Sequence, residues 1–146
     1  MTGYRAFTTG YPDRTVVLSS AVEISKATRT GERVKVFPAR ALWDTGATCC
    51  CITKNVAQAL GLNPVRKASV LTAAGYVLEN IYEVCFQLPN NVAINLEVTE
   101  ISAVSEDMDA IIGMNIIGLG DFAVSNFDGR TQMTFRVPSM VHADYT

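Results

Sequence analysis

The sequence lacks most of the features that signal a membrane, a secretory route or a nucleic-acid partner. No stretch approaches the ~18 continuous apolar residues of a membrane-spanning helix, and residues 1–14 are polar, without the apolar segment of a signal peptide. Lys and Arg are scattered singly and the formal net charge is −2. This charge pattern gives no indication of binding to nucleic acid or to an anionic membrane. We therefore expect a cytoplasmic protein with neither kind of partner.

The sequence also lacks the cysteine and histidine spacing of a disulfide framework or a zinc site. Three of its four cysteines are consecutive (Cys49, Cys50 and Cys51), the fourth is Cys85, and the one histidine is His142 near the end. Neighbouring residues of a strand point to opposite faces, so the triplet cannot readily surround a tetrahedral metal ion. We expect free thiols in a reducing compartment, no metal site and no cofactor.

What the sequence does contain is a pattern typical of a folded β protein. Hydrophobic residues make up 49% and charged residues 18% of a length that fits a single domain, residues 1–146. Apolar residues recur with period two almost throughout, which predicts an all-β, barrel-like fold. Strands are expected at residues 15–24, 33–43, 70–71, 77–88, 92–101, 122–125 and 133–137, turns at 29–32, 89–91 and 126–130, and short helices at 54–60 and 113–119.

The motif with the most chemical content is Asp44-Thr45-Gly46-Ala47, which follows the apolar run Ala41-Leu42-Trp43. Taken alone, Asp-Thr-Gly can be an aspartate that caps a turn after a strand. Far downstream, however, the sequence Ile111-Ile112-Gly113-Met114-Asn115 follows in the expected order. Together the two motifs resemble the retroviral-type aspartic proteases, the single-domain retropepsins, with the closest pattern in their non-viral, cellular members.

The resemblance implies a catalytic role for Asp44 and structural roles for its neighbours. Two carboxylates a few ångströms apart can activate water and protonate an amide nitrogen, because like charges that close hold one proton between them. The chain has only one Asp-Thr-Gly, so a two-fold homodimer would supply the second aspartate. Thr45 would hydrogen-bond across the two-fold axis, and Gly46 would bring a backbone N–H close to the carboxylate.

The resemblance also implies where a peptide or protein substrate would bind. A flap hairpin is expected at Thr72-Ala73-Ala74-Gly75-Tyr76, and the floor at Gly46 and Ala47. Cys49 and Cys51 fall where family members line a substrate pocket; packing of these thiols in the core is an equally weighted alternative. The expected substrate-binding residues are Ala47, Cys49, Cys51, Ala73, Ala74, Gly75, Tyr76 and Ile111.

The fold implied is a retropepsin-like closed β-barrel with a flap hairpin and one or two short helices. The resemblance covers residues 16–138, leaving short extensions at both ends. Two positions depart from the viral pattern, in which an Asp and an Arg form an ion pair; this chain has Thr48 and Met114 there. Both partners are replaced together, so no lone buried charge remains.

Three functions remain open at this point. The first is an aspartic endopeptidase acting as a homodimer. The second is a catalytically inactive peptide-binding or dimerisation module that kept the fold. The third is an unrelated small β-barrel that binds a small ligand, with Asp44 as a turn residue.

Overall fold

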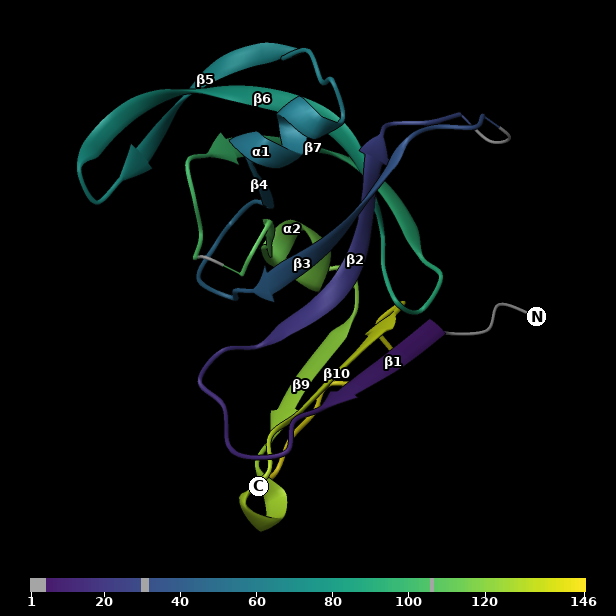
Figure 1. Cartoon of the computed structure of the whole chain (residues 1–146). Coiled ribbons are helices and arrows are strands. Elements are labelled where there is room, and N and C mark those ends of the chain that lie inside the picture. The colour runs from purple at the N-terminus through teal and green to yellow at the C-terminus, as the bar shows by residue number, and fades with distance from the viewer. Residues whose placement is uncertain (1–4, 30–31, 106) are drawn as a thin grey trace.

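The computed structural model describes residues 5–29, 32–105 and 107–146 and shows two β-sheets with two short α-helices (Figure 1). The prediction of a mostly β fold with one or two short helices is confirmed. In chain order the elements are β1 (Arg5–Gly10), β2 (Ser19–Lys26), β3 (Val36–Trp43), β4 (Cys51–Thr53), α1 (Lys54–Ala59), β5 (Arg66–Thr72), β6 (Gly75–Gln87), β7 (Ala93–Ile101), β8 (Ala110–Ile112), α2 (Met114–Ile117), β9 (Asp121–Ser125), the 3₁₀ turn η1 (Phe127–Gly129) and β10 (Gln132–Val137).

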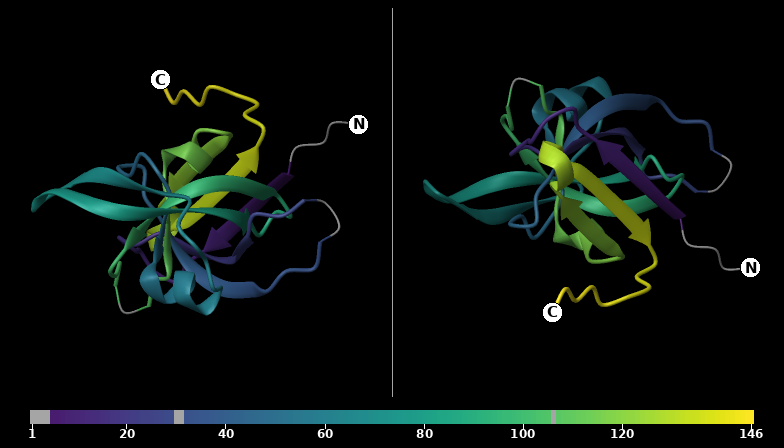
Figure 2. Two further views of the ribbon diagram at one scale, coloured as in Figure 1. Left: turned by 90° about the horizontal axis from the view of Figure 1, so that it is seen from above. Right: turned by 90° about the horizontal axis from the view of Figure 1, so that it is seen from below.

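Six strands of the larger sheet close into a ring. The order is β2-β3-β8-β4-β7-β6-β5, and β2 also pairs with β6, from Glu23↔Gln87 to Lys26↔Val84. The 13-residue strand β6 pairs with β7 and β2 through its second half and with β5 through its first half. The β5–β6 hairpin therefore extends beyond the ring and projects from the body of the molecule in both further views (Figure 2).

The smaller sheet, of order β1-β10-β9, is joined to the ring by a cluster of aromatic rings around Trp43. The Trp43 ring lies 5.7 Å from Phe7, 5.1 Å from Phe135 and 5.5 Å from Phe122, with the Phe122 ring almost parallel to it. Its Nε1–H donates to the Ser20 hydroxyl at 2.8 Å. Because Trp43 is the last residue of β3, this cluster fixes the point at which the Asp44 loop begins.

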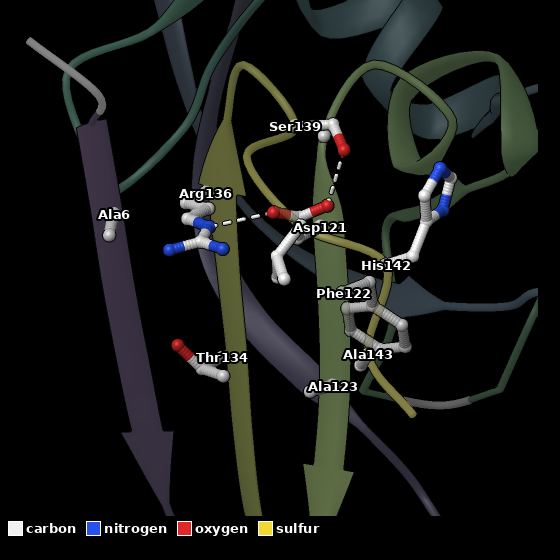
Figure 3. Close-up of a pocket in the computed structure, with 11 residues that line it drawn as sticks. Ala6, Asp121, Phe122, Ala123, Thr134, Arg136, Ser139, His142 and Ala143 are labelled. Atoms are coloured by element: carbon white, nitrogen blue, oxygen red, sulfur yellow. Dashed lines mark hydrogen bonds and ion pairs between the residues drawn. The ribbon is translucent and has the colours of Figure 1, made fainter. Parts of the chain in front are cut away.

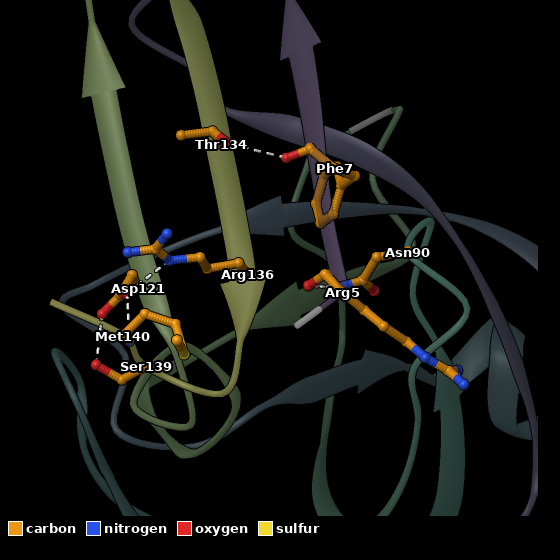
Figure 4. Close-up of polar contacts among 8 residues, drawn as sticks. All are labelled: Arg5, Phe7, Asn90, Asp121, Thr134, Arg136, Ser139 and Met140. Carbon is orange, nitrogen blue, oxygen red and sulfur yellow. Dashed lines mark hydrogen bonds and ion pairs between the residues drawn. The ribbon is translucent and has the colours of Figure 1, made fainter. Parts of the chain in front are cut away.

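Strand β1 was not anticipated from the sequence, which placed residues 1–14 outside the core. It pairs antiparallel with β10 along its whole length, from Arg5↔Val137 to Gly10↔Gln132. Its backbone is also tied by side chains (Figure 4): the Asn90 amide donates to the Arg5 carbonyl at 3.0 Å, and the Thr134 hydroxyl donates to the Phe7 carbonyl at 3.1 Å. All three strands of the small sheet therefore come from the same chain.

The predicted short helices and turns agree with the structure where it is described. Helix α1 buries Val56 and Ala57 and is followed by Gly61 with φ of +60°, a left-handed conformation that suits glycine at a helix end. The predicted turn at 126–130 joins β9 to β10. In the predicted turn at 29–32, residues 30 and 31 lie outside the described residues. Neither α-helix in the described ranges is long and apolar enough to cross a bilayer.

Candidate active site

Asp44 lies where the two sequence motifs meet. It follows β3, and its backbone N–H donates to the carbonyl of Ile112 at 3.0 Å. Strands β3 and β8 are parallel neighbours, with Trp43 opposite Ile112. The structure therefore brings the Asp-Thr-Gly and Ile-Ile-Gly segments side by side, although they are far apart in the chain.

The Asp44 carboxylate is held by the backbone of its own loop. The Gly46 N–H donates to Asp44 Oδ1 at 2.8 Å, and the Ala47 N–H donates to the Asp44 carbonyl at 3.2 Å. The side chain is half-buried, and no other side chain in the described part of the chain hydrogen-bonds or forms an ion pair with it. The loop thus presents an oriented carboxylate with one oxygen left for a further partner, while Thr45 and Gly46 are exposed beside it.

The second motif supports this loop from behind. The Met114 N–H donates to the Ala47 carbonyl at 2.8 Å, and the Asn115 N–H donates to the Thr48 carbonyl at 3.2 Å. The start of α2 thereby satisfies two carbonyl groups of the Asp44 loop, which would otherwise lack partners. At the two positions that depart from the viral pattern, these backbone bonds connect the loop and the helix without an ion pair.

Cys50 and Asn115 form a contact that the sequence analysis missed. The Asn115 side-chain oxygen accepts from the Cys50 N–H and from the Cys50 thiol, each at 3.0 Å, and the Gly113 N–H donates to Cys50 Sγ at 3.3 Å. Cys50 is fully buried, and burial raises the pKa of its thiol to about 12. The sequence signal was the asparagine of Ile-Ile-Gly-x-Asn, which was recognised without a role for its side chain.

Cys49 and Cys51, on either side of Cys50, are the more accessible thiols of the triplet. Cys49 is exposed and Cys51 half-buried, while Cys50 points into the interior. Cys51 is opposite Ile111 in neighbouring antiparallel strands. The pKa of the Cys51 thiol is raised to about 11, mainly because the thiol is buried and to a smaller extent because Cys49 and Asp44 are close to it. All four cysteines are free thiols.

The expected flap residues lie at the tip of the β5–β6 hairpin. Thr72 pairs with Gly75, which leaves a two-residue turn at Ala73 and Ala74, and Gly75 has φ of +106°. Tyr76 is 76% exposed, and no hydrogen bond in the described residues connects this tip to the Asp44 loop. The structure therefore connects Ala47 and Cys51 with Asp44, sets Ile111 opposite Cys51, and puts Ala73, Ala74, Gly75 and Tyr76 at the hairpin tip.

The sequence contains a single Asp-Thr-Gly, at Asp44. Within residues 5–29, 32–105 and 107–146, no group of three His, Cys, Asp or Glu side chains could hold a metal ion. A cavity of about 580 Å³ is found elsewhere, against the small sheet and the C-terminal residues, and Asp44 does not line it (Figure 3).

A ring of six strands, a projecting hairpin and an Asp-Thr-Gly loop supported by Ile-Ile-Gly define a retropepsin-like aspartic protease fold. The chain belongs to the gag-polyprotein putative aspartyl protease family, whose sequence model matches residues 33–119, more than half of the chain. No curated protein sequence matches it significantly.

Solved structures of viral and non-viral proteases share the fold. A retropepsin-like aspartic protease from Rickettsia conorii matches with a TM-score of 0.57 at 11% identity, covering 94% of this chain and 98% of that one. The retroviral protease-like domain of Ddi1 from Leishmania major matches with a TM-score of 0.52 at 16% identity, covering 90% and 99%. The EIAV protease in complex with an inhibitor matches with a TM-score of 0.51 at 18% identity, covering 70% and 86%. These likenesses establish the fold, and the expected resemblance to retropepsins is confirmed.

Proposed function

We propose that the chain is an aspartic endopeptidase that works as a homodimer, with one Asp44 from each protomer. The observation that carries the proposal is the Asp44 carboxylate itself, with one oxygen held by the Gly46 N–H at 2.8 Å in a loop supported by α2. A two-fold axis beside this loop would place the carboxylate next to its copy. Family membership supports the same reaction class.

In this mechanism the two carboxyl groups share one proton. The ionised group takes a proton from a water molecule, which attacks the peptide carbonyl, and the protonated group donates to the leaving nitrogen. Atoms balance as the net addition of one water across the peptide bond. The pair titrates as a unit, so the expected optimum is acid-shifted, at about pH 4–6.

The substrate would be an extended peptide held by main-chain hydrogen bonds between the hairpin tip and the floor at Gly46 and Ala47. Cys51, whose thiol pKa is raised in part by Asp44, lies opposite the apolar Ile111. The hairpin adds exposed apolar groups, with Leu71 and Tyr76 67% and 76% exposed. We therefore expect cleavage beside hydrophobic residues, by a single-domain protomer acting inside the cell.

The test is digestion of a complex peptide library at several pH values by wild type and by Asp44→Asn. Asp128→Asn is a matched control, because Asp128 also precedes a glycine but lies in the β9–β10 turn with φ of +53°, which asparagine adopts readily. We expect cleavages that Asp44→Asn abolishes and Asp128→Asn retains. Dimers without cleavage at any pH would instead indicate the inactive peptide-binding module.

A further inference from the structure

One face of the large sheet continues from the Asp44 loop toward the β5–β6 hairpin. Cys51 lies opposite Ile111 of β8 and opposite Thr99 of β7. Thr99 in turn lies opposite Ile81 of β6. Residues opposite each other in neighbouring strands point to the same face of a sheet, so these four side chains form one row. The row starts next to the Asp44 loop, because the residue after Ile111 accepts a hydrogen bond from the Asp44 N–H.

The same face extends along the hairpin to Glu79. Side chains two apart in a strand share a face, so Glu79 and Val77 continue the face of Ile81 toward the hairpin tip. Across the hairpin, Ala68 lies opposite Glu79. Glu79 is half-buried, whereas its neighbour Leu78 on the other face is 66% exposed. Glu79 thus lies on the same side of the sheet as the row that begins at the catalytic loop, in the part of the hairpin that projects beyond the ring (Figure 2).

Glu79 has no side-chain partner among the described residues. Other glutamates of the adjoining strand have one: Glu97 forms an ion pair with Arg66 at 2.5 Å, and Glu100 accepts from the Tyr82 hydroxyl. None of the side-chain hydrogen bonds and ion pairs in the described part of the chain involves Glu79. Its carboxylate is therefore partly withdrawn from water without a compensating cation.

The side chains next to Glu79 on its face are apolar. Val77 and Ile81 precede and follow it along β6, and Ala68 lies across the hairpin. An anion among apolar groups loses part of its hydration, and an opposite charge that reaches it offsets this cost. Because Ala68 is small, it leaves room over the carboxylate for a long side chain.

We propose that Glu79 binds a lysine or arginine side chain of the substrate, so that the enzyme favours peptides with a basic residue a few positions from the hydrophobic cleavage site. The inference rests on the proposed endopeptidase function and specifies its substrates. In that function the hairpin tip lies over the cleaved bond. Gly75 at the tip and Glu79 are four residues apart in β6, about 13 Å, a length that an extended peptide covers in about four residues. The basic residue is therefore expected within about four residues of the cleaved bond, on either side, since each protomer contributes one Glu79.

Peptides that differ in one residue test the inference. Extended peptides with a central pair of apolar residues carry lysine, glutamine or glutamate at one position, up to about four residues to either side, and kcat/KM is measured at about pH 6. We expect the lysine peptide to exceed the glutamine peptide by about three- to tenfold at one position or more, with the glutamate peptide poorest. Equal values for all three peptides at every position would overturn the inference.

Variants of Glu79 assign the preference to this residue. Glu79→Gln should bring the ratio of kcat/KM for lysine and glutamine peptides close to one, and Glu79→Lys should favour the glutamate peptide. Glu83→Gln is the matched control, because Glu83 lies on the same strand and face but is exposed and four residues farther from the tip. The ratio is taken within each variant, so a general change of activity does not alter it. A ratio that Glu79→Gln leaves unchanged, or that Glu83→Gln abolishes, would refute the role of Glu79.

A binding measurement makes the inference independent of cleavage. Asp44→Asn, with and without Glu79→Gln, is titrated against the same peptides carrying a fluorophore, and fluorescence anisotropy is followed at low and high salt. We expect the lysine peptide to bind more tightly than the glutamine peptide only when Glu79 is present, and the difference to shrink in high salt.

The two experiments separate this inference from the proposed function. Lysine-selective binding that needs Glu79, in a protein that cleaves nothing, would retain the Glu79 site and refute the proposed activity. Cleavage that needs Asp44 but shows no preference for charge would retain the proposed function and refute the Glu79 site. Peptides that are neither cleaved nor bound would refute both.

Discussion

Gly113 lies against the Cys49 carbonyl so closely that a β-carbon at Gly113 would be 2.6 Å from that oxygen. The same β-carbon would be 2.8 Å from the carbonyl oxygen of Ala47. Both contacts are to backbone, which cannot rotate away. The glycine of the second motif is thus required by the close packing of α2 against the Asp44 loop.

Gly113→Ala should therefore destabilise the protein and displace the Asp44 loop. We expect a loss of about 1–3 kcal/mol in the free energy of unfolding, as is typical of overpacking, measured by urea denaturation, together with reduced peptide cleavage. Gly10→Ala is the control, because a β-carbon at Gly10 meets nothing within 4 Å. Equal stability of the two variants would contradict this account of Gly113.

The hydrogen bonds between Cys50 and Asn115 should couple these residues energetically. Asn115→Ala leaves the Cys50 N–H without its acceptor, and Cys50→Ala leaves the Gly113 N–H without one. Each unsatisfied buried group costs about 1–3 kcal/mol. In a double-mutant cycle followed by urea denaturation, we expect a coupling energy of about 0.5–3 kcal/mol between contacting residues. Additive effects would show that the two side chains act independently.

The three consecutive cysteines should differ sharply in reactivity. At pH 7.5 an alkylating reagent should modify the exposed Cys49 first, whereas Cys50 and Cys51, whose pKa values are raised to about 12 and 11, remain largely protonated. Labelling of Cys51 should rise about tenfold per pH unit below its pKa. Peptide mapping by mass spectrometry measures each site.

A bound statine-type inhibitor extends the labelling experiment to the substrate pocket. If Cys49 and Cys51 line the pocket, the inhibitor should protect them, while Cys85, which is buried between β6 and its neighbours, serves as an internal reference. Labelling that the inhibitor leaves unchanged would favour the alternative that these thiols only pack against the core.

Asp121 should stabilise the protein in a pH-dependent way. Hydrogen bonds from the Ser139 hydroxyl and the Met140 N–H hold the pKa of Asp121 well below its usual range. The hydrogen bond and positive charge of Arg136 lower it further. Because the folded-state pKa is depressed, this stabilisation is fully present above the ordinary aspartate pKa of about 3.9 and is lost as the pH falls below it. The urea midpoint of Asp121→Asn should be lower than that of wild type at pH 5–7, and the two should converge in strong acid.

Ser139→Ala provides a graded version of this measurement, since it removes one donor and leaves the carboxylate in place. Its midpoint should lie between those of wild type and Asp121→Asn at pH 5–7. A difference between wild type and Asp121→Asn that persists unchanged down to pH 2 would show that the carboxylate charge is not the cause.

The sequence predicted the elements whose residues carry their own local signal. The Asp44 loop, the helix ending at Gly61 and the β9–β10 hairpin each have a motif or a turn residue within a few positions. Strand β1 has only Phe7 as a large apolar residue, and its partner β10 lies at the other end of the chain. Nothing local distinguishes such a strand from a polar extension, because its stability comes from pairing and from the contact of Phe7 with Trp43.

In the candidate site, the two motifs were recognised from their residues and order, and the structure brings Asp44 and Ile112 together. The bonds of Cys50 to Asn115 and Gly113 depend on how α2 is placed against the loop, which no spacing rule encodes. The extension of the hairpin beyond the ring is likewise a property of the long β6 strand, not of the tip residues.

The pairing of β1 with β10 inside one chain has a consequence for how cleavage would depend on the amount of protein. Each protomer completes its own sheets, so assembly of the proposed site is a separate step between folded chains. Well below the dissociation constant, the concentration of dimers grows with the square of the protein concentration, and doubling the protein would quadruple the rate of cleavage. The quantity of protein made would then itself set a threshold, with proteolysis nearly absent in dilute solution and rising steeply as the chain accumulates.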